Sequence, residues 1–497
     1  MASAAIQTIT ILGGGTAGWM SAALLARRLG PGGVRITLVE SDEIGTIGVG
    51  EATVPLIRHF NDALGIDEAD FLCATQGTYK LGIEFCDWGR PGNTHFHGFG
   101  DYGEAIDGLS PHHYWLRRRG EGDAAAIDEH SLPYALARRG KFAPADPRVP
   151  AYAHAYHFDA TLYAGYLRRL AESWGVTRVE GRVRDVPLDG ETGHIRALTM
   201  EDGRSIGGDF FIDCSGFAAL LIGRALGTDY LDWSRWLPCD SALAVPCVGD
   251  GAPAPFTRST ARAAGWQWRI PLQHREGNGY VYASAHISDA EAEATLLANL
   301  AGAPLAAPRR IRFTPGRRAQ FWRGNCVAVG FAGGFLEPLE SSGIQLIQNA
   351  ISRFIEFFPA RPGDPAIAAE YNRVTALEWE RIRDFLIAHY CLSQRSEPLW
   401  AACRAMAIPE TLQHKLDVWR ACGRVPLYDQ DSYLEPSWVA ILLGNGCVPD
   451  AWHPAADMPP IDALGAAMAR RRADLVRLAQ SAPDHRAYIA RTCKAEQ

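Results

Sequence analysis

The chain has 497 residues, of which 47% are hydrophobic, so it is long enough to bury at least one large core. Its formal net charge is -7, and it contains neither a basic field for nucleic acid nor a polybasic run beside an apolar helix. Composition therefore favours a soluble protein with a small-molecule partner.

The N-terminus runs straight into an apolar strand pattern, without the cationic segment and cleavage site of a secretory signal. No apolar stretch approaches the roughly 20 residues that a membrane helix needs. The 11 cysteines occur singly, with no CxxC pair to form a metal or redox site. We therefore expect a cytoplasmic protein with reduced cysteines, no metal site, and no membrane or nucleic-acid partner.

The first 40 residues have the pattern of a strand, a glycine turn, a helix and a second strand. Thr8 to Leu12 is a short apolar run with β-branched residues, whereas Trp19 to Leu29 is rich in alanine and leucine. Val34 to Val39 predicts the second strand, and Glu40 follows it directly. This order predicts a βαβ unit with a right-handed parallel crossover.

The later chain alternates strand and helix patterns before becoming mostly helical. The predicted elements are a helix over residues 159–174, a hairpin over 185–206, a strand over 209–213, a separate sheet within 244–311, and helices over 352–358, 366–391 and 409–422. The predicted fold class is α/β, in which a Rossmann-like module is interleaved with a mixed sheet and followed by a mostly helical C-terminal module.

The glycine turn has the sequence Gly13-Gly14-Gly15-Thr16-Ala17-Gly18. In such a turn Gly13 permits the sharp bend, Gly15 lets a pyrophosphate approach the backbone, and Gly18 lets the helix pack on the strand. Glu40 is placed to accept the ribose hydroxyls. The pattern predicts a dinucleotide site but does not choose between NAD and FAD.

Four further segments resemble the flavin-dependent tryptophan halogenases, and together with the glycine turn they occur in the order of that family over residues 11–344. They are Gly48-Val49-Gly50-Glu51-Ala52-Thr53-Val54-Pro55, Asp213-Cys214-Ser215-Gly216, Trp266-Gln267-Trp268-Arg269-Ile270-Pro271, and the stretch from Gly333 to Ile344. The W-x-W-x-I-P pattern of the third segment is the signature of the family.

The resemblance implies an FAD-binding module like that of the flavin monooxygenases. The residues expected to bind FAD are Gly13, Gly15, Thr16, Ala17, Gly18, Glu40, Val49, Ala52, Val183, Phe331 and Ile344. Phe331 departs from the family, which often has a polar residue there. We expect residues 1–350 to form the FAD-binding module, with interleaved substrate-pocket segments that include about 80–160, and residues 351–497 to form a helical substrate-binding module.

In this family, reduced FAD, O2 and a halide form hypohalous acid, which travels through an internal tunnel to the organic substrate. Lys80 matches the family's lysine, which holds the halogen either as hydrogen-bonded hypohalous acid or as a haloamine. The alternative is an ordinary surface lysine. The resemblance further implies chloride or bromide as co-substrate and a separate NAD(P)H-dependent flavin reductase, because no nicotinamide site is apparent in the chain.

Glu340 matches the carboxylate that takes the proton of the ring, and Ser341 matches its companion serine. The alternative for Glu340 is a cap on the helix that begins near Ser341. The backbone amides of Ser342 and Gly343 would hold the halide at this helix start.

His97 and Phe99 match the aromatic residues that flank the substrate, although a loop histidine bonded to backbone is the alternative for His97. Trp438 is a further candidate substrate contact, because Ser437-Trp438 stands in place of the tyrosine pair that recognises free tryptophan in the family. The substrate expected is therefore an indole, another aromatic, or a tryptophan within a larger molecule.

Trp266 and Trp268 lie two residues apart, so on a strand both face one side. The resemblance implies that they shield the flavin, and ordinary aromatic packing is the alternative.

Two other functions stay open for the chain as a whole: an FAD-dependent aromatic monooxygenase and a non-enzymatic flavin sensor. We expect a monomer or a homodimer.

Overall fold

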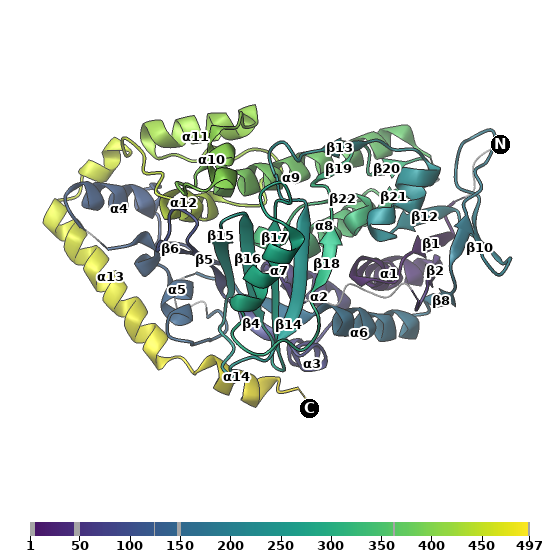
Figure 1. Ribbon diagram of the computed structural model, residues 1–497, viewed down its shortest axis with the longest axis horizontal. Helices are drawn as coiled ribbons and strands as arrows, with labels where there is room; N and C mark the ends of the chain where they lie inside the picture. Colours follow the sequence, from purple (N-terminus) through teal and green to yellow (C-terminus); the bar gives the residue numbers. More distant parts are fainter. Residues whose placement is uncertain (1–4, 44–49, 124, 147–150, 361–362, 496–497) are drawn as a thin grey trace. The chain divides into compact units, whose positions relative to one another are not determined.

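The computed structural model describes residues 5–43, 50–123, 125–146, 151–360 and 363–495 (Figure 1). The chain divides into two compact units, each built from three segments. The first unit comprises Met1–Gly77, Phe158–Arg235 and Phe313–Glu380, and the second comprises Thr78–His157, Trp236–Arg312 and Arg381–Gln497. The division predicted at residue 350 separates an FAD-binding module from a substrate-binding module by function, and it stays a prediction.

A six-stranded sheet forms the centre of the first unit, in the order β20-β21-β12-β1-β2-β8. Its strands are β1 (Thr8–Leu12), β2 (Arg35–Glu40), β8 (Thr177–Glu180), β12 (Phe210–Asp213), β20 (Trp322–Arg323) and β21 (Cys326–Ala328). All neighbouring pairs are parallel except β20 and β21. The parallel βαβ unit and the α/β class predicted from the sequence are confirmed.

Helix α1 (Thr16–Leu29) connects β1 to β2 and begins three residues before the predicted start at Trp19. The difference arises because Gly15, in an extended conformation, is already the N-cap. The predicted helix after Asp159 is α6 (Ala160–Ser173), which Asp159 caps by accepting hydrogen bonds from the backbone amides of Thr161 and Leu162. Helix α1 packs against both α6 and α8 (Ser342–Glu356).

The rest of the first unit consists of short elements. They are α2 (Leu56–Leu64), α3 (Glu68–Ala74), β3 (Gly50–Ala52), the antiparallel group β9 (Val183–Asp185), β10 (Ala197–Met200) and β11 (Ser205–Gly207), and the antiparallel group β13 (Tyr230–Asp232), β19 (Gly316–Arg318) and β22 (Gly334–Phe335). Within the hairpin predicted over residues 185–206, a turn at Gly203, which has a φ of 88°, joins β10 to β11.

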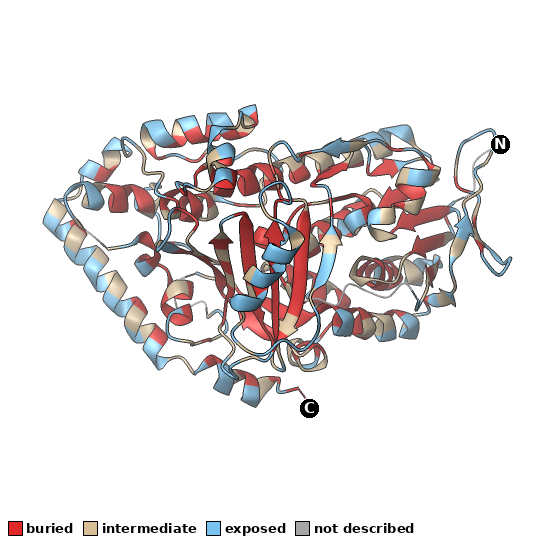
Figure 2. Cartoon of the chain, viewed as in Figure 1, coloured by how far each residue is buried: buried red, intermediate tan, exposed pale blue. Residues whose placement is uncertain are grey.

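A seven-stranded sheet dominates the second unit, in the order β18-β14-β17-β16-β15-β5-β6. Its strands are β5 (Gly82–Cys86), β6 (Thr94–Gly98), β14 (Ser241–Cys247), β15 (Thr257–Arg262), β16 (Gly265–Pro271), β17 (Glu276–Tyr282) and β18 (Arg309–Arg312). The sheet predicted within residues 244–311 is confirmed, and it gains β5 and β6 from an earlier part of the chain. Figure 2 shows its central strands buried and the edge strand β18 largely exposed.

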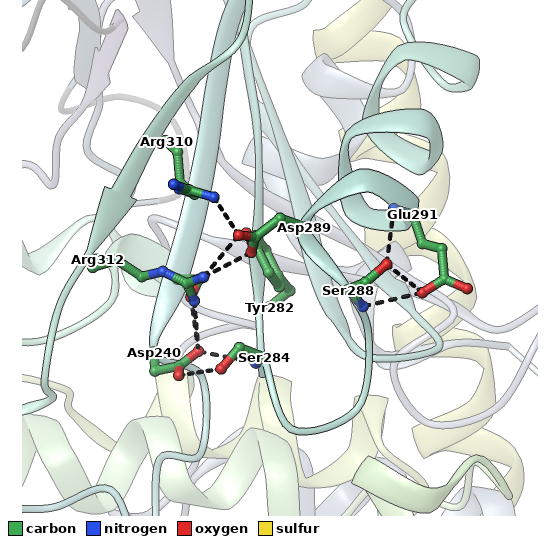
Figure 3. A network of polar contacts seen from close by, with 9 residues as sticks. Asp240, Tyr282, Ser284, Ser288, Asp289, Glu291, Arg310 and Arg312 are labelled. Atoms are coloured by element: carbon green, nitrogen blue, oxygen red, sulfur yellow. Dashed lines mark hydrogen bonds and ion pairs between the residues drawn. The ribbon is translucent and has the colours of Figure 1, made fainter.

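Helix α7 (Asp289–Ala298) is tied to this sheet by polar contacts (Figure 3). Asp289 accepts a hydrogen bond from the Tyr282 hydroxyl of β17 at 2.7 Å and pairs with Arg312 of β18 at 2.8 Å. Ser288 and Glu291 form a capping box at the start of the helix. The Asp289 contacts tie α7 to β17 and β18, and the helix packs against β14 and β17.

The remaining elements of the second unit are mostly helical, as predicted for the C-terminal region. They are β4 (Thr78–Lys80), β7 (Ala155–Asp159), α4 (Pro111–Gly120), α5 (Leu132–Ala137), α10 (Pro398–Ala405), α11 (Glu410–Cys422), α12 (Glu435–Gly444), α13 (Ile461–Ser481) and α14 (His485–Thr492), while α9 (Pro365–Cys391) passes from the first unit into the second at Glu380. Within the described residues, no helix has both the length and the apolarity needed to cross a membrane.

Candidate functional site

The predicted dinucleotide turn lies in the first unit, between β1 and α1. Gly13 has a φ of 112°, and a Cβ on it would be 2.2 Å from the carbonyl oxygen of Cys214. A Cβ on Gly18 would be 1.8 Å from the carbonyl oxygen of Gly13, whereas one on Gly15 would meet no atom within 4 Å. The turn therefore needs glycine at positions 13 and 18 for its own packing, and at position 15 it leaves room beside the backbone.

The Glu40 carboxylate lies directly over this turn. A Cβ on Gly14 would be 1.4 Å from Glu40 Oε2, so the acid and the turn are in contact. Arg178 of β8 donates to Glu40 Oε1 at 2.5 Å. The position suits an acid that binds ribose hydroxyls, and Arg178, which the sequence did not indicate, orients it.

The start of helix α8, where the sequence predicts the halide site, has an unusual backbone. Ser341 is the N-cap in the left-handed region with a φ of 60°, and its side chain makes no capping hydrogen bond. Glu340 ends the short 3-10 turn Pro338–Glu340 and is 1% exposed. Ser342 is buried, and a Cβ on Gly343 would meet no atom within 4 Å. Ser341, and not Glu340, is thus the N-cap residue of α8.

The other residues expected to bind FAD are also in the first unit, apart from Val49, which lies outside the described residues. Ala52 and Ile344 are buried on β3 and α8, and Val183 packs beside the core cluster that contains Leu12 and Val39. The contacts of these residues with FAD stay predictions.

Phe331 lies in the 3-10 turn Gly330–Ala332, close to the start of α1, because a Cβ on Gly330 would be 2.8 Å from the Cβ of Ala17. It is 38% exposed and stacks on Phe217, with ring centroids 4.7 Å apart.

Lys80 is the last residue of β4 in the second unit and is fully buried, with 0% exposure. Its ammonium lies 5.2 Å from the centroid of the Phe99 ring. The alternative of a surface lysine is therefore wrong. Lys80 and Phe99, for which the sequence predicts separate roles, come together because the Phe99 amide donates to the carbonyl of Leu81 at 2.9 Å.

Two buried histidines hold the strand that carries Lys80. His157 of β7 lies opposite Thr78, and its Nδ1 is 2.9 Å from the Thr78 hydroxyl. His485 accepts a hydrogen bond from the Tyr79 amide at 3.2 Å. Burial is the largest cause that lowers the pKa of each, that of His485 to about 4, and the positive charge of Lys80 further lowers the pKa of His157. No sequence motif indicated either histidine.

The substrate residues predicted near His97 belong to a cluster of buried rings. His97 lies on β6, so its expected alternative placement in a loop is wrong. Its ring is 5.9 Å from that of Phe385 and 6.2 Å from that of Tyr433, and the latter two stack with centroids 3.9 Å apart. Trp438 meets the edge of Phe385 at 4.8 Å. Phe385 and Tyr433 thus link the predicted residues His97 and Trp438.

Trp266 and Trp268 lie on β16 of the second unit, both buried, with ring centroids 6.1 Å apart. Trp88 contacts Trp266 at 6.4 Å, and a Cβ on Gly279 would be 2.1 Å from the ring of Trp268. Both rings therefore take part in aromatic packing, and their shielding of a flavin stays a prediction.

The structure thus collects the predicted FAD residues, Glu340 and the halide residues in the first unit. It collects Lys80, His97, Phe99, Trp438 and the two tryptophans of β16 in the second. Across the described part of the chain, no group of three or more His, Cys, Asp or Glu residues is arranged to hold a metal ion.

Comparison with known proteins identifies relatives along almost the whole chain. The profile of the family described as tryptophan halogenase matches residues 8–460. The tryptophan 6-halogenase SttH of Streptomyces toxytricini is 38% identical over 477 residues, which cover 88% of this chain and 89% of the relative.

Two solved structures have the same fold and a higher identity. BrvH, a flavin-dependent halogenase from Brevundimonas sp. BAL3, has 48% identity and a TM-score of 0.94, with coverage of 98% of this chain and 99% of that protein. A flavin-dependent halogenase from Xanthomonas campestris has 45% identity and a TM-score of 0.97, with coverage of 99% of both chains.

Proposed function

Because the chain belongs to the tryptophan halogenase family, whose members are flavin-dependent enzymes, we propose that it halogenates an electron-rich aromatic compound, an indole. The co-substrates are reduced FAD, O2 and chloride or bromide. A separate NAD(P)H-dependent reductase supplies the reduced FAD. The observation that carries the proposal is the fully buried Lys80, held against the Phe99 ring in a member of this family.

The glycine turn fits a dinucleotide. Gly15 leaves open space at the start of α1, where helix amides attract a pyrophosphate, and the Glu40 carboxylate lies against the adjacent Gly14. Gly13, Gly15, Thr16, Ala17 and Gly18 would bind the phosphates, and Glu40 the ribose.

When bound, reduced FAD supplies two electrons to O2 while the halide supplies two more, which gives one water and one hypohalous acid. The amides of Ser342 and Gly343 hold the halide at the start of α8, where the helix dipole favours an anion. Gly343 has the open space that this requires.

Lys80 holds the hypohalous acid near the aromatic ring. An ammonium that donates a hydrogen bond to the oxygen of hypohalous acid makes the halogen more electrophilic, because it stabilises the departing hydroxide. Transfer forms the carbon–halogen bond and breaks the oxygen–halogen bond. The displaced ring proton goes to Glu340, and its later release from the carboxyl group balances the departing hydroxide as water.

Glu340 accepts the ring proton, with Ser341 beside it in sequence. A carboxylate that is 1% exposed is stripped of most of its water, so it can stabilise a cationic ring intermediate strongly. The buried rings of His97 and Trp438 hold the flat substrate by stacking. Since the tyrosine pair for free tryptophan is replaced by Ser437-Trp438, the proposed substrate is an indole without a free amino-acid backbone.

The proposal is tested by the mass of the product. The protein is incubated with FAD, a flavin reductase, NADH, indole and bromide, and a parallel reaction omits bromide. We expect a product that carries one bromine and forms only with bromide. A product that gains oxygen would identify a monooxygenase, and flavin binding without any product would identify a sensor; both outcomes contradict the proposal.

A further inference from the structure

A chain of buried hydrogen bonds runs from the strand of Lys80 to the end of the W-x-W-x-I-P segment. The Thr78 hydroxyl donates to the carbonyl oxygen of Pro271 at 2.7 Å and lies 2.9 Å from His157 Nδ1. On the other side of the ring, His157 Nε2 is 2.9 Å from the Thr257 hydroxyl. We call these four residues the histidine chain. The side chains of Thr78, His157 and Thr257 are buried, and Pro271 contributes its backbone carbonyl.

The direction of each hydrogen bond in the histidine chain follows from the carbonyl at its end. The Pro271 carbonyl can only accept, so the Thr78 hydroxyl uses its one hydrogen there. The Thr78 oxygen must then accept from His157 Nδ1, which therefore carries a hydrogen. Since burial keeps the ring neutral, Nε2 has none and accepts from the Thr257 hydroxyl. The imidazole is thus fixed as its Nδ1–H tautomer.

This arrangement acts directly on the short strand that bears Lys80. Thr78 and Lys80 are the first and last residues of β4. Along β7, His157 is paired with Thr78, and Ala155 is paired with Lys80. Thr257 begins β15 and Pro271 ends β16, so the histidine chain anchors β4 to two strands of the seven-stranded sheet. A neutral ring does so without placing a second positive charge beside Lys80.

We propose that His157 is a positioning residue for Lys80: as the neutral Nδ1–H tautomer it ties β4 through Thr78 to the Pro271 carbonyl and thereby sets where the lysine ammonium lies. The inference rests on the proposed function, in which Lys80 directs the halogen after the flavin step. It also gives the last residue of the W-x-W-x-I-P segment a role that does not depend on the two tryptophans.

The test measures halogenated indole formed per reduced FAD reoxidised, together with the melting temperature. In His157→Leu the donor to Thr78 is lost, and we expect this ratio to fall between about 10-fold and 100-fold, as small misplacements of catalytic groups do. The rate of flavin reoxidation should not change. His157→Asn, whose amide can donate from near the Nδ1 position, should recover most of the ratio, and the exposed His286→Leu should not alter it.

A purely structural role predicts a different result. In that case His157→Leu lowers the melting temperature and the amount of active enzyme while each active molecule keeps the wild-type ratio, and this result overturns the inference. Lys80→Ala is measured in parallel. If it retains halogenation, the proposed function itself fails, whereas a loss in Lys80→Ala with an unchanged ratio in His157→Leu contradicts only the inference.

A second measurement does not depend on the folding of His157→Leu. The ¹⁵N spectrum of wild-type protein labelled at histidine, assigned with His157→Asn, should show at neutral pH a protonated Nδ1 and a bare Nε2 for His157. An Nε2–H tautomer or an imidazolium would overturn the proposal.

Discussion

The candidate sites of the two units depend on different parts of the chain, backbone in the first unit and side chains in the second. In the first unit, the start of α1 depends on backbone: Gly13 and Gly18 leave no space for a side chain, and Gly15 leaves open space. In the second unit, Lys80 depends on side chains from distant segments, among them His157 and His485. The difference teaches that a change in the glycine turn of the first unit should act on flavin binding, and a change around Lys80 on the fate of the halogen.

The largest effect is expected from Gly18→Ala in the first unit. Its Cβ would lie 1.8 Å from the Gly13 carbonyl oxygen, so backbone must move, at a cost of about 3 kcal/mol or more. Gly15→Ala meets no atom of the protein within 4 Å and should keep the wild-type melting temperature while binding FAD at least about 10-fold more weakly, since the methyl group enters the space proposed for the pyrophosphate.

Melting curves and FAD titrations separate these two variants. Gly32→Ala, which also meets no atom within 4 Å, is the control and should match the wild type in both measurements. If Gly15→Ala binds FAD normally, the pyrophosphate does not lie at this turn.

The next largest effect is expected from Glu340→Gln. The amide keeps the volume of the side chain but accepts a proton poorly, so we expect halogenation at least about 100-fold slower with flavin reoxidation unchanged. The rate is measured with indole under single-turnover conditions. The exposed Glu356→Gln at the far end of α8 is the matched control, and a wild-type rate in Glu340→Gln would assign its carboxylate a structural role only.

A competition between indole and free tryptophan tests whether the ring cluster around His97 and Trp438 prefers an indole without an amino-acid backbone. The ammonium and carboxylate of tryptophan, left poorly paired in a partly buried pocket, should lower its catalytic efficiency about 100-fold relative to indole. Equal amounts of both are offered with bromide, FAD and a reductase, and the two brominated products are quantified. Preferential turnover of tryptophan would mean that other residues recognise the amino-acid backbone.

The smallest change to be measured, a few degrees of melting temperature, concerns acid stability. The pKa of His485 is lowered by burial from 6.5 to about 4 in the folded protein, so between these values the unfolded chain binds more protons. Stability from this group is complete above pH 6.5 and is lost as the pH falls to about 4, by about 3 kcal/mol in total.

The variant His485→Gln keeps an acceptor for the Tyr79 amide but lacks the titrating ring. As the pH falls from 6.5 to 4, its melting temperature should therefore decrease by a few degrees less than that of the wild type. The exposed His286→Gln should retain the wild-type acid dependence. An identical pH dependence in His485→Gln would show that His485 is charged in the folded protein.

The sequence predicted the parts of the fold that depend on local pattern. β1 was predicted at its observed bounds, and the glycine turn and the position of Glu40 follow from backbone conformation within 40 residues. The start of α1 was misplaced by three residues, because apolar periodicity begins at Trp19 while the cap is Gly15. A pattern of side chains marks a helix face better than a helix end.

The surroundings of Lys80 could not be predicted in the same way. Its neighbours come from β7, β15 and α14, and no local pattern reports that His157 or His485 will lie beside β4. Phe385 is one apolar residue among many on α9, so only the folded chain shows that its ring links His97 to Trp438. The identity of Lys80 as a candidate came from family resemblance, while its burial came from the structure.

The central claim is that Lys80 acts on the halogen and not on the flavin. The direct test compares Lys80→Ala with Lys141→Ala, a partly exposed lysine of the same unit, and measures the rate of flavin reoxidation and the yield of brominated indole in the same reactions. We predict wild-type reoxidation in both variants and no brominated product in Lys80→Ala alone. Brominated indole at the wild-type yield from Lys80→Ala would contradict the account.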